Sequence, residues 1–590
     1  MDTSLTESRD GLRQAVDDEI NSLQESIRAL RSRRNALVPI SCLSSKTLAA
    51  IFSYFSFSGW EKEVSFLFQL EDAGHLIDVT HVCRRWRETA LDDPRLWSRI
   101  NFTRATLPPA CIAETFSRAK MTPLHLDADA IEWSVAQFDA LSRHLEAHIS
   151  HTRHLKVRGP LQSMPERLVS SAPALEFLSL SHKSSPSAHV VIPVNLFNFT
   201  APSLTSLELE GCDISWKLSV LKGLESLQVL RPSTEARPEL EDWLDALNEM
   251  PRLKTLILES ATPVALSAPP KPEPSRTVTL PFLTKFHISA SAKDCVLALA
   301  HIVLPALIWL QVDAESHEKD GEDVRLLIPY VAQNVCGLQE IEPLRSIVII
   351  YGKRTSAELV AWSTADADLK FYDIKFSLLR YDTSVPARLK FAATGSNWDN
   401  EVNTAILDAL LMLLPMNSVS TLTTKSCTEL SKKFWLSHAP RWPLLKQIRL
   451  NTTAVKGFRE MLAEDTSPDG PRLPSLTKLI LAAVRLTALR TLDLRDMLIE
   501  RVEQGVPLEV LDLFWSYSAG RAIYLLREVV VDVTGPHKIK EDPAYSNLEL
   551  HGGTGYFNEV EYCDVEPWYG YSGSSGESQY SDYDEVRYDW

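Results

Sequence analysis

Aliphatic residues recur at a nearly constant spacing over most of the chain. The pattern is L-x-x-L-x-L or a close variant, and most intervals between successive copies are 20–31 residues. Alternation of apolar and polar positions at the end of each copy predicts a short β-strand with one buried face. Clear copies begin at Leu175, Leu204, Leu224, Leu253, Leu283, Leu307, Leu344, Leu445, Leu476, Leu489 and Leu508, and looser copies begin at Phe371 and Val419.

This period is typical of leucine-rich repeats, in which each unit supplies a strand and a helix or turn. Many copies follow a proline, as at Pro173 and Pro202, and helical stretches such as 240–250 and 402–414 separate the strands. Because no unit can bury its leucines alone, the units must stack on one another. Residues 101–535 are therefore expected to form an α/β solenoid of the horseshoe type. The alternative is a globular α/β domain with coincidental leucine spacing.

Two details predict that this array is irregular. The asparagine ladder of regular leucine-rich repeats is missing, and a proline-rich loop at 265–277 interrupts the pattern. The copies at Leu476 and Leu489 are only 13 residues apart, so one of them is expected to be a false match.

The N-terminal segment, 1–37, is expected to be helical, with a narrow apolar seam. The pattern favours one amphipathic helix that packs on the following domain, and self-association as a coiled coil is the alternative. The seam positions alternate at spacings of three and four: Val16, Ile20, Leu23, Ile27, Leu30 and Leu37, with Arg34 breaking the series.

A compact helical unit is expected at 38–100. Ser44 or Ser45 can cap a first helix that carries apolar residues at i, i+3, i+4 and i+7. A second helix is expected to end at Asp92-Asp93-Pro94, because proline disfavours helical geometry in the residue before it. The apolar positions are Leu48, Ile51, Phe52 and Phe55 in the first helix, and Val79, Val82, Cys83, Trp86 and Ala90 in the second.

These residues carry a resemblance to a known family. The stretch Val82-Cys83-Arg84-Arg85-Trp86, followed by Leu96-Trp97, resembles the second half of an F-box, and residues 38–55 resemble its first half. With the preceding helix, the unit is similar to F-box-like proteins of mushroom-forming fungi. The family usually opens with Leu-Pro-x-Glu, whereas this chain has Leu43-Ser44-Ser45-Lys46, and a longer insert at 57–78 separates the two halves.

The resemblance implies a substrate-recognition adaptor of a Skp–cullin–F-box ubiquitin ligase. The box would bind a Skp-type adaptor and through it a cullin, and the repeat array would bind a protein substrate. Arg84, Arg85 and Arg87 lie either on the solvent face of the second helix or on an acidic adaptor surface. The positions implied to contact the adaptor are Pro39, Leu43, Leu48, Ile51, Phe52, Val82, Cys83, Trp86, Leu96 and Trp97.

Charge and composition exclude several other classes of protein. The net charge of −16 argues against a nucleic-acid-binding protein, whose surface would be basic. Half of that charge lies in 559–590, within an acidic, tyrosine-rich tail at 536–590 that is expected to be disordered. The eight scattered cysteines indicate a reducing compartment, the cytoplasm or the nucleus. No uncharged apolar run is long enough to cross a membrane.

Catalytic chemistry is not expected, so the chain is predicted to be no enzyme and to need neither a cofactor nor a metal. No nucleotide-binding, hydrolase or C-x-x-C motif is present. His144, His148 and His151 fall at i, i+4 and i+7 of a predicted helix, with His154 beyond them, and a solvent-facing stripe is preferred to a zinc site. The alternative function is a non-ligase repeat scaffold whose degenerate box only caps the array.

Overall fold

The chain folds around one long β-sheet. The structure is a computed structural model that describes residues 3–534 with internal gaps. Most of the long insert in the box, at 58–74, lies outside the described residues, as do the centre of the proline-rich loop and the acidic tail. The gaps are 58–74, 103–107, 184–188, 266–273, 337–341, 352–355, 365–371, 375–377, 381–386, 397, 427–429, 452–453, 464–469, 483–484, 487, 514–516 and 519.

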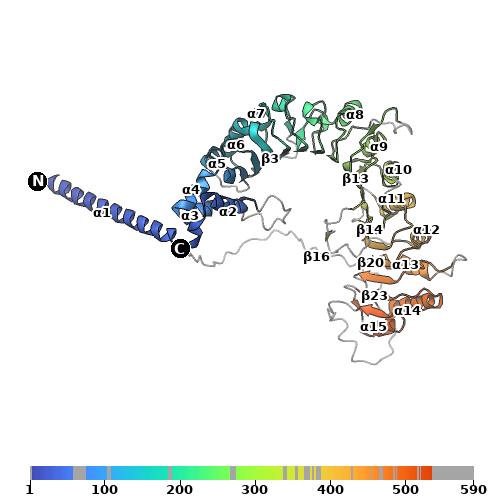
Figure 1. The fold of residues 1–590 in the computed structure, drawn as a ribbon. Helices are drawn as coiled ribbons and strands as arrows, with labels where there is room; N and C mark the ends of the chain where they lie inside the picture. Colours follow the sequence, from blue (N-terminus) through green and yellow to red (C-terminus); the bar gives the residue numbers. More distant parts are fainter. Residues whose placement is uncertain are drawn as a thin grey trace, which may run out of the picture. The chain divides into compact units, whose positions relative to one another are not determined.

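In the part of the chain that the structure describes, seventeen strands make up the sheet, and all of them except β15 run parallel. Their order follows the chain closely, so that most strands pair with their sequence neighbours (Figure 1). The spatial order is β1 (Arg99–Phe102), β2 (Leu124–Asp129), β3 (Thr152–Gly159), β4 (Phe177–His182), β6 (Ser206–Glu210), β8 (Ser226–Leu230), β9 (Thr255–Glu259), β11 (Lys285–Ser291), β13 (Trp309–Ser316), β18 (Leu389–Gly395), β15 (Ser356–Trp362), β14 (Ser346–Tyr351), β19 (Thr421–Ser426), β20 (Gln447–Asn451), β21 (Lys478–Ala482), β23 (Val510–Asp512) and β25 (Asp532–Thr534).

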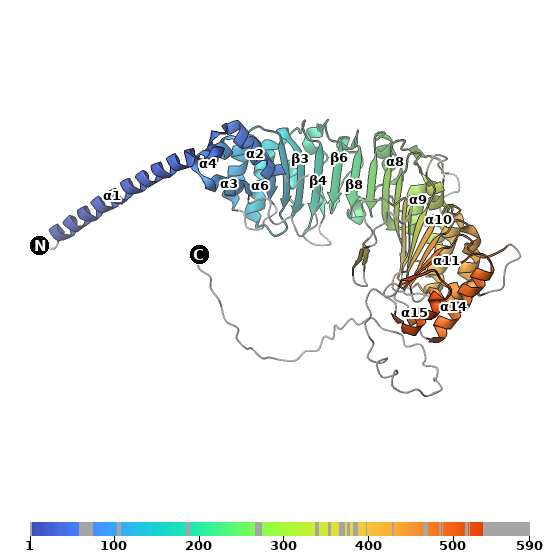
Figure 2. The same ribbon diagram turned by 60° about the horizontal axis from the view of Figure 1, so that its bottom comes forward.

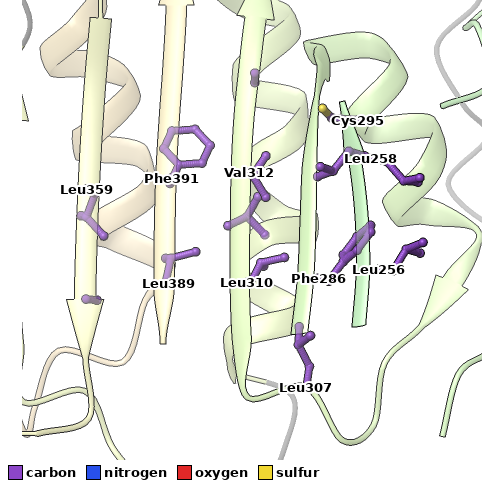
Figure 3. Packing of buried hydrophobic residues seen from close by; sticks show 14 of the residues in the cluster. Leu256, Leu258, Phe286, Cys295, Leu307, Leu310, Val312, Leu359, Leu389 and Phe391 are labelled. Atoms are coloured by element: carbon purple, nitrogen blue, oxygen red, sulfur yellow. The ribbon is translucent and has the colours of Figure 1, made fainter. Parts of the chain in front are cut away.

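The leucines of the repeated pattern form the core on one face of this sheet. Leu207 of β6 pairs in register with Leu227 of β8, and Leu256 of β9 pairs with Phe286 of β11. All four side chains are buried, and Figure 3 shows the continuation of this ladder through the neighbouring strands. Because successive side chains of a strand alternate between faces, the intervening residues lie on the opposite side, called here the open face.

Helices cover the core face. Helices α9, α10 and α11 pack against strands β11, β13 and β15, and Figure 2 shows the helical layer along the sheet. The helices of the array are α5 (Pro109–Ala119), α6 (Val135–His148), α7 (Met164–Arg167), α8 (Leu240–Asn248), α9 (Ala292–Ala300), α10 (Glu322–Cys336), α11 (Asn400–Leu413), α12 (Lys432–His438), α13 (Val455–Leu462), α14 (Ala488–Glu503) and α15 (Gly520–Arg527). The helical stretches expected at 240–250 and 402–414 correspond to α8 and α11.

The order of strands is interrupted between β13 and β19. Strands β14 and β15 form an antiparallel hairpin, and β18 then returns to pair with β13 on one side and β15 on the other. The pattern predicts a strand of the main sheet at Phe371, and this prediction is wrong. Strand β16 (Tyr372–Ile374) instead pairs with β17 (Leu378–Arg380) in a separate two-stranded sheet. Leu389 and Phe391 of β18 supply the core residues in its place.

A second copy of the pattern is also a false match. Residues 489–494 lie in α14, whereas the copy that begins at Leu476 forms strand β21. A spacing of three between leucines suits a helix as well as it suits the turn before a strand, so sequence spacing alone does not separate the two.

Arginine side chains satisfy backbone carbonyls in the turns of the array, where an asparagine ladder is missing. Arg501, only 3 % exposed, donates to the carbonyl oxygens of Arg472 and Leu473, at 2.9 and 3.2 Å. Arg388 donates to the carbonyl oxygen of Leu307, and Arg441 donates to the carbonyl oxygens of Leu411 and Leu414 at the C-terminal end of α11. Burial lowers the pKa of Arg501 to about 10, which leaves the guanidinium charged at neutral pH. These contacts meet the hydrogen-bonding requirement of the buried carbonyls.

The predicted N-terminal helix is present as α1 (Thr3–Ala36). The favoured interpretation, that it packs on the next domain, is wrong for the described residues. Val16, Ile20 and Leu23 of the seam keep exposed fractions of 55, 45 and 57 %. Helix α1 contacts the short 3₁₀ turn η1 (Pro39–Cys42) that follows it.

Candidate functional site

Three short helices build the box between α1 and the sheet. They are α2 (Ser45–Phe57), α3 (His75–Val82) and α4 (Arg84–Asp92), followed by the 3₁₀ turn η2 (Pro94–Trp97). Ser44 caps α2, because its Oγ accepts a hydrogen bond of 3.1 Å from the backbone N–H of Thr47. Helix α4 ends before Pro94 as the sequence predicts. The core holds five buried apolar residues: Leu48, Phe52, Val79, Ala90 and Leu96.

The second predicted helix is in fact two helices. Cys83 adopts an extended conformation, with φ −159° and ψ 168°, and separates α3 from α4. The break turns Val82 outward, with 58 % of its surface exposed, while the Trp86 ring packs 5.1 Å from the Phe52 ring. A single helix would have placed both side chains on the same face. The tertiary contact of Trp86 therefore overrides the continuous helical pattern.

The three arginines of the box do not share one role. Arg84 and Arg87 are exposed. Arg85 is half-buried, and its guanidinium donates to the carbonyl oxygens of Ser41 and Leu43. Arg85 thus joins α4 to the segment before α2 and holds the box together. This structural role differs from both roles expected for the three arginines.

The ten positions implied to contact an adaptor divide into three groups. Leu48, Phe52 and Leu96 are at most 2 % exposed and belong to the core of the box. Leu43, Cys83, Trp86 and Trp97 are half-buried, and Pro39, Ile51 and Val82 are exposed. Contact with an adaptor stays a prediction for all ten, and the exposed residues are the ones available for it.

This region also exposes apolar side chains at positions that the family resemblance does not implicate in adaptor contact. They lie on η1, α2 and α3 and in the turn that leads into them. Together with Ile51 and Val82, these residues are called here the exposed apolar set. The set has more members than the box has buried core residues. Its other members are Leu37, Val38, Ile40, Tyr54 and Ile77, between 38 and 86 % exposed. Exposed apolar side chains mark a binding surface where they lie together as one patch.

Trp97 joins the box to the sheet. Its ring packs against both the box core and the core of the array, and its Nε1 donates to the carbonyl oxygen of Ala90 at 2.7 Å. The guanidinium of Arg118, on α5, lies 5.0 Å above the ring. Strand β1 begins two residues after Trp97, so no linker separates the box from the array. The predicted domain boundary at 100 therefore falls inside a strand of the main sheet.

The open face of the sheet is polar and half-exposed along its N-terminal strands. Oppositely charged residues face each other across neighbouring strands, with Lys156 Nζ 3.9 Å from Asp127 and Arg158 3.5 Å from Asp129. Further along, the Glu210 carboxylate binds both Lys183, at 2.5 Å, and Arg231. The Lys156–Asp127 and Arg158–Asp129 pairs are partly exposed and contribute little to stability, so their residues are available to a partner, whereas the Glu210 side chain is only 19 % exposed.

An aromatic ladder lies beside these charges on the open face. The ring of His154 stacks on Phe177, with centroids 4.1 Å apart, and the ring of His125 lies 6.2 Å from His154. Burial, together with the smaller effects of the neighbouring His125 and Lys156, lowers the pKa of His154 to about 4. His154 is therefore neutral in the folded protein at neutral pH.

The pKa of His154 predicts loss of stability in acid. The folded state favours the neutral ring, so its contribution is fully present above the unfolded pKa of 6.5 and is lost as pH falls toward 4. At pH 5 this loss is about 1 kcal/mol after allowance for solvent screening. Chemical denaturation at pH 7.5 and pH 5 should show a smaller pH effect in His154→Phe than in the natural chain. The exposed His317, changed to Phe, is the control and should leave the pH effect unchanged.

The other histidines of this region do not form the predicted stripe. Helix α6 ends at His148, so His151 lies beyond it in a 3₁₀ turn. The rings of His144 and His148 are half-buried and each lie 5.3 Å from the buried Phe116 ring, rather than facing solvent. Among the residues that the structure describes, no group of three or more His, Cys, Asp or Glu side chains could hold a metal ion.

The comparisons with known proteins agree with this geometry in one region. A family model described as F-box-like matches residues 45–103, which cover the box helices, η2 and strand β1. An F-box-like domain is therefore present at 45–103, and proteins with this domain are generally adaptors rather than enzymes. No curated protein matches the chain. Within the described parts of the chain, no helix is long and apolar enough to span a membrane.

Proposed function

We propose that the chain is a substrate-recognition adaptor of a Skp–cullin–F-box ubiquitin ligase. The observation that carries this proposal is the exposed apolar set on a box that matches the F-box-like family. A Skp-type adaptor would cover these side chains and bring a cullin with it. Removing such apolar surface from water is the main source of binding energy at protein interfaces.

The array would supply the surface for a protein substrate. We propose that its units form an irregular leucine-rich-repeat solenoid, because parallel strands repeat in register with a buried leucine ladder. The open face then offers charged pairs and the aromatic ladder to the substrate. Rigid attachment through Trp97 would fix the distance between the substrate and the ligase. The six described cysteines are free thiols, which is consistent with the cytoplasm or the nucleus.

A second candidate is a scaffold whose box only caps the array. The packing of Trp97 against both cores favours the capping role, since through this residue the box packs on the core of the array. Under this alternative, the exposed apolar set would have no adaptor to bind.

Binding of the purified full chain to a Skp-type adaptor tests the two candidates. We expect the double variant Ile51→Asp, Val82→Asp to bind at least about tenfold more weakly, because each carboxylate would be buried against an apolar partner. Both residues are exposed, at 37 and 58 %, so the variant should keep its circular dichroism spectrum and melting temperature.

The matched control places the same substitutions on the array. Ile308 and Val191 are 58 and 70 % exposed, and their change to aspartate should leave adaptor affinity unaltered. Unaltered affinity in the folded box variant would rule out docking through Ile51 and Val82. A natural chain that binds no Skp-type adaptor would instead favour the capping role.

A further inference from the structure

Helix α1 carries an apolar seam that no other described residue covers. The exposed fractions of Val16, Ile20, Leu23, Ile27 and Leu30 lie between 45 and 63 %. These residues alternate at spacings of four and three, which places isoleucine at heptad position a and leucine or valine at position d. An alternating seam of this kind is typical of coiled coils, in which a second helix covers positions a and d. The seam of α1 therefore needs a second helix to bury it.

The charge along α1 is divided between its two halves. Residues 12–24 carry three acidic side chains and one basic side chain, whereas residues 25–37 carry four basic side chains and one acidic one. Every charged side chain in the described part of the helix is exposed. The helix is thus complementary to itself when two copies run in opposite directions.

We propose that α1 binds α1 of a second copy of this chain as an antiparallel two-stranded coiled coil. In this arrangement Leu23 of one helix packs against Ile27 of the other, close to the two-fold axis. Positions e face e across an antiparallel seam, and positions g face g. The seam would bury residues that are now half-exposed, and the acidic half of each helix would lie along the basic half of its partner.

The flanking positions fit this register on both sides of the seam. Asp17 and Arg31 occupy position e, so each aspartate comes to the level of an arginine of the second copy. Glu19 and Arg33 occupy position g and are matched in the same way. Two-fold symmetry therefore gives four ion pairs. Within the described part of the chain, none of these four residues makes an ion pair of its own.

The parallel arrangement is disfavoured by the same residues. Arg34 occupies position a and would face Arg34 of the second copy across the seam, where like charges repel. In a parallel pair, the acidic residues 17–19 of one helix would also lie beside the acidic residues 17–19 of the other. In the antiparallel register Arg34 lies opposite the small apolar side chain of Val16 instead.

The oligomeric state of the full chain tests the proposal, by sedimentation velocity at several concentrations. We expect a dimer for the natural chain and a monomer for Leu23→Lys, Ile27→Lys. The control Asn21→Lys, Ser22→Lys adds the same charge outside the seam and should remain a dimer. A monomeric natural chain, or a dimer that persists in the seam variant, would overturn the proposal.

Charge reversal tests the direction of the helices. Asp17→Arg, Glu19→Arg should weaken dimerisation at least about tenfold, since four ion pairs are lost and repulsion between like charges replaces them. Arg31→Asp, Arg33→Glu should do the same, and combining all four substitutions should restore the dimer. Failure of the combined variant to recover would contradict antiparallel pairing. These outcomes do not depend on whether the box binds a Skp-type adaptor.

Discussion

Phe286→Ala should lower the free energy of unfolding by about 3–5 kcal/mol, the usual cost of truncating a fully buried aromatic side chain. Phe286 lies in β11 and is 0 % exposed. It fills the space between Leu256 of β9 and Leu310 of β13, which are its partners in register on either side (Figure 3). Removal of the ring leaves a cavity that the two neighbouring strands cannot close without breaking their own register.

The loss should be local as well as large. Each strand contacts its immediate neighbours, so hydrogen exchange should accelerate in β9, β11 and β13 and change little in β21 or β23. Phe282 is the matched control, because it lies four residues earlier with 58 % of its surface exposed. Phe282→Ala should change stability by less than about 0.5 kcal/mol. Equal acceleration of exchange along the whole sheet would show that the array unfolds as one globular core.

Gly457→Ala should also be strongly destabilising, because it adds an atom where there is no space for one. Gly457 lies in the first turn of α13, where an added Cβ would clash with the carbonyl oxygen of Leu430 and come within 2.8 Å of the carbonyl carbon of Ser431. Both obstacles are backbone atoms of the two residues just before α12, so no side-chain rotation relieves the clash. We expect a loss of about 3 kcal/mol, the upper end of the cost of overpacking. Thermal unfolding would measure it.

Gly11 provides the control for this substitution. It lies in helix α1, and a Cβ there would meet no atom within 4 Å. Gly11→Ala should therefore raise the helix content slightly, because alanine favours a helix over glycine by about 1 kcal/mol. Equal stability of the Gly457→Ala variant and the natural chain would mean that α12 and α13 can separate at little cost.

Local patterns predicted much of the secondary structure. The leucine ladder marks strands such as β6, β8 and β9, because alternation with a period of two is a property of the strand itself. Ser44 and Pro94 mark the start of α2 and the end of α4, since capping and proline act on the nearest turn. The polar alternation in β2 and β3 gave no comparable signal, and neither strand was predicted.

Contacts between residues distant in the chain decided the rest. The chain reverses at β15, and β18 inserts between β13 and β15, because strand pairing there depends on neighbours that no local pattern specifies. In the box, packing of Trp86 on Phe52 breaks the second helix at Cys83, and Arg85 turns inward to carbonyls more than 40 residues away.

The sequence by itself determined the F-box-like segment, the repeated strands and the apolar seam of α1, because each depends on spacing along a few turns or one strand. Only the tertiary structure decided which apolar residues are available for binding. Leu48 and Ile51 lie three residues apart on α2, yet Leu48 is fully buried and Ile51 is 37 % exposed. The difference arises because the neighbouring helices cover only one side of α2, and the sequence of α2 does not specify where those helices lie.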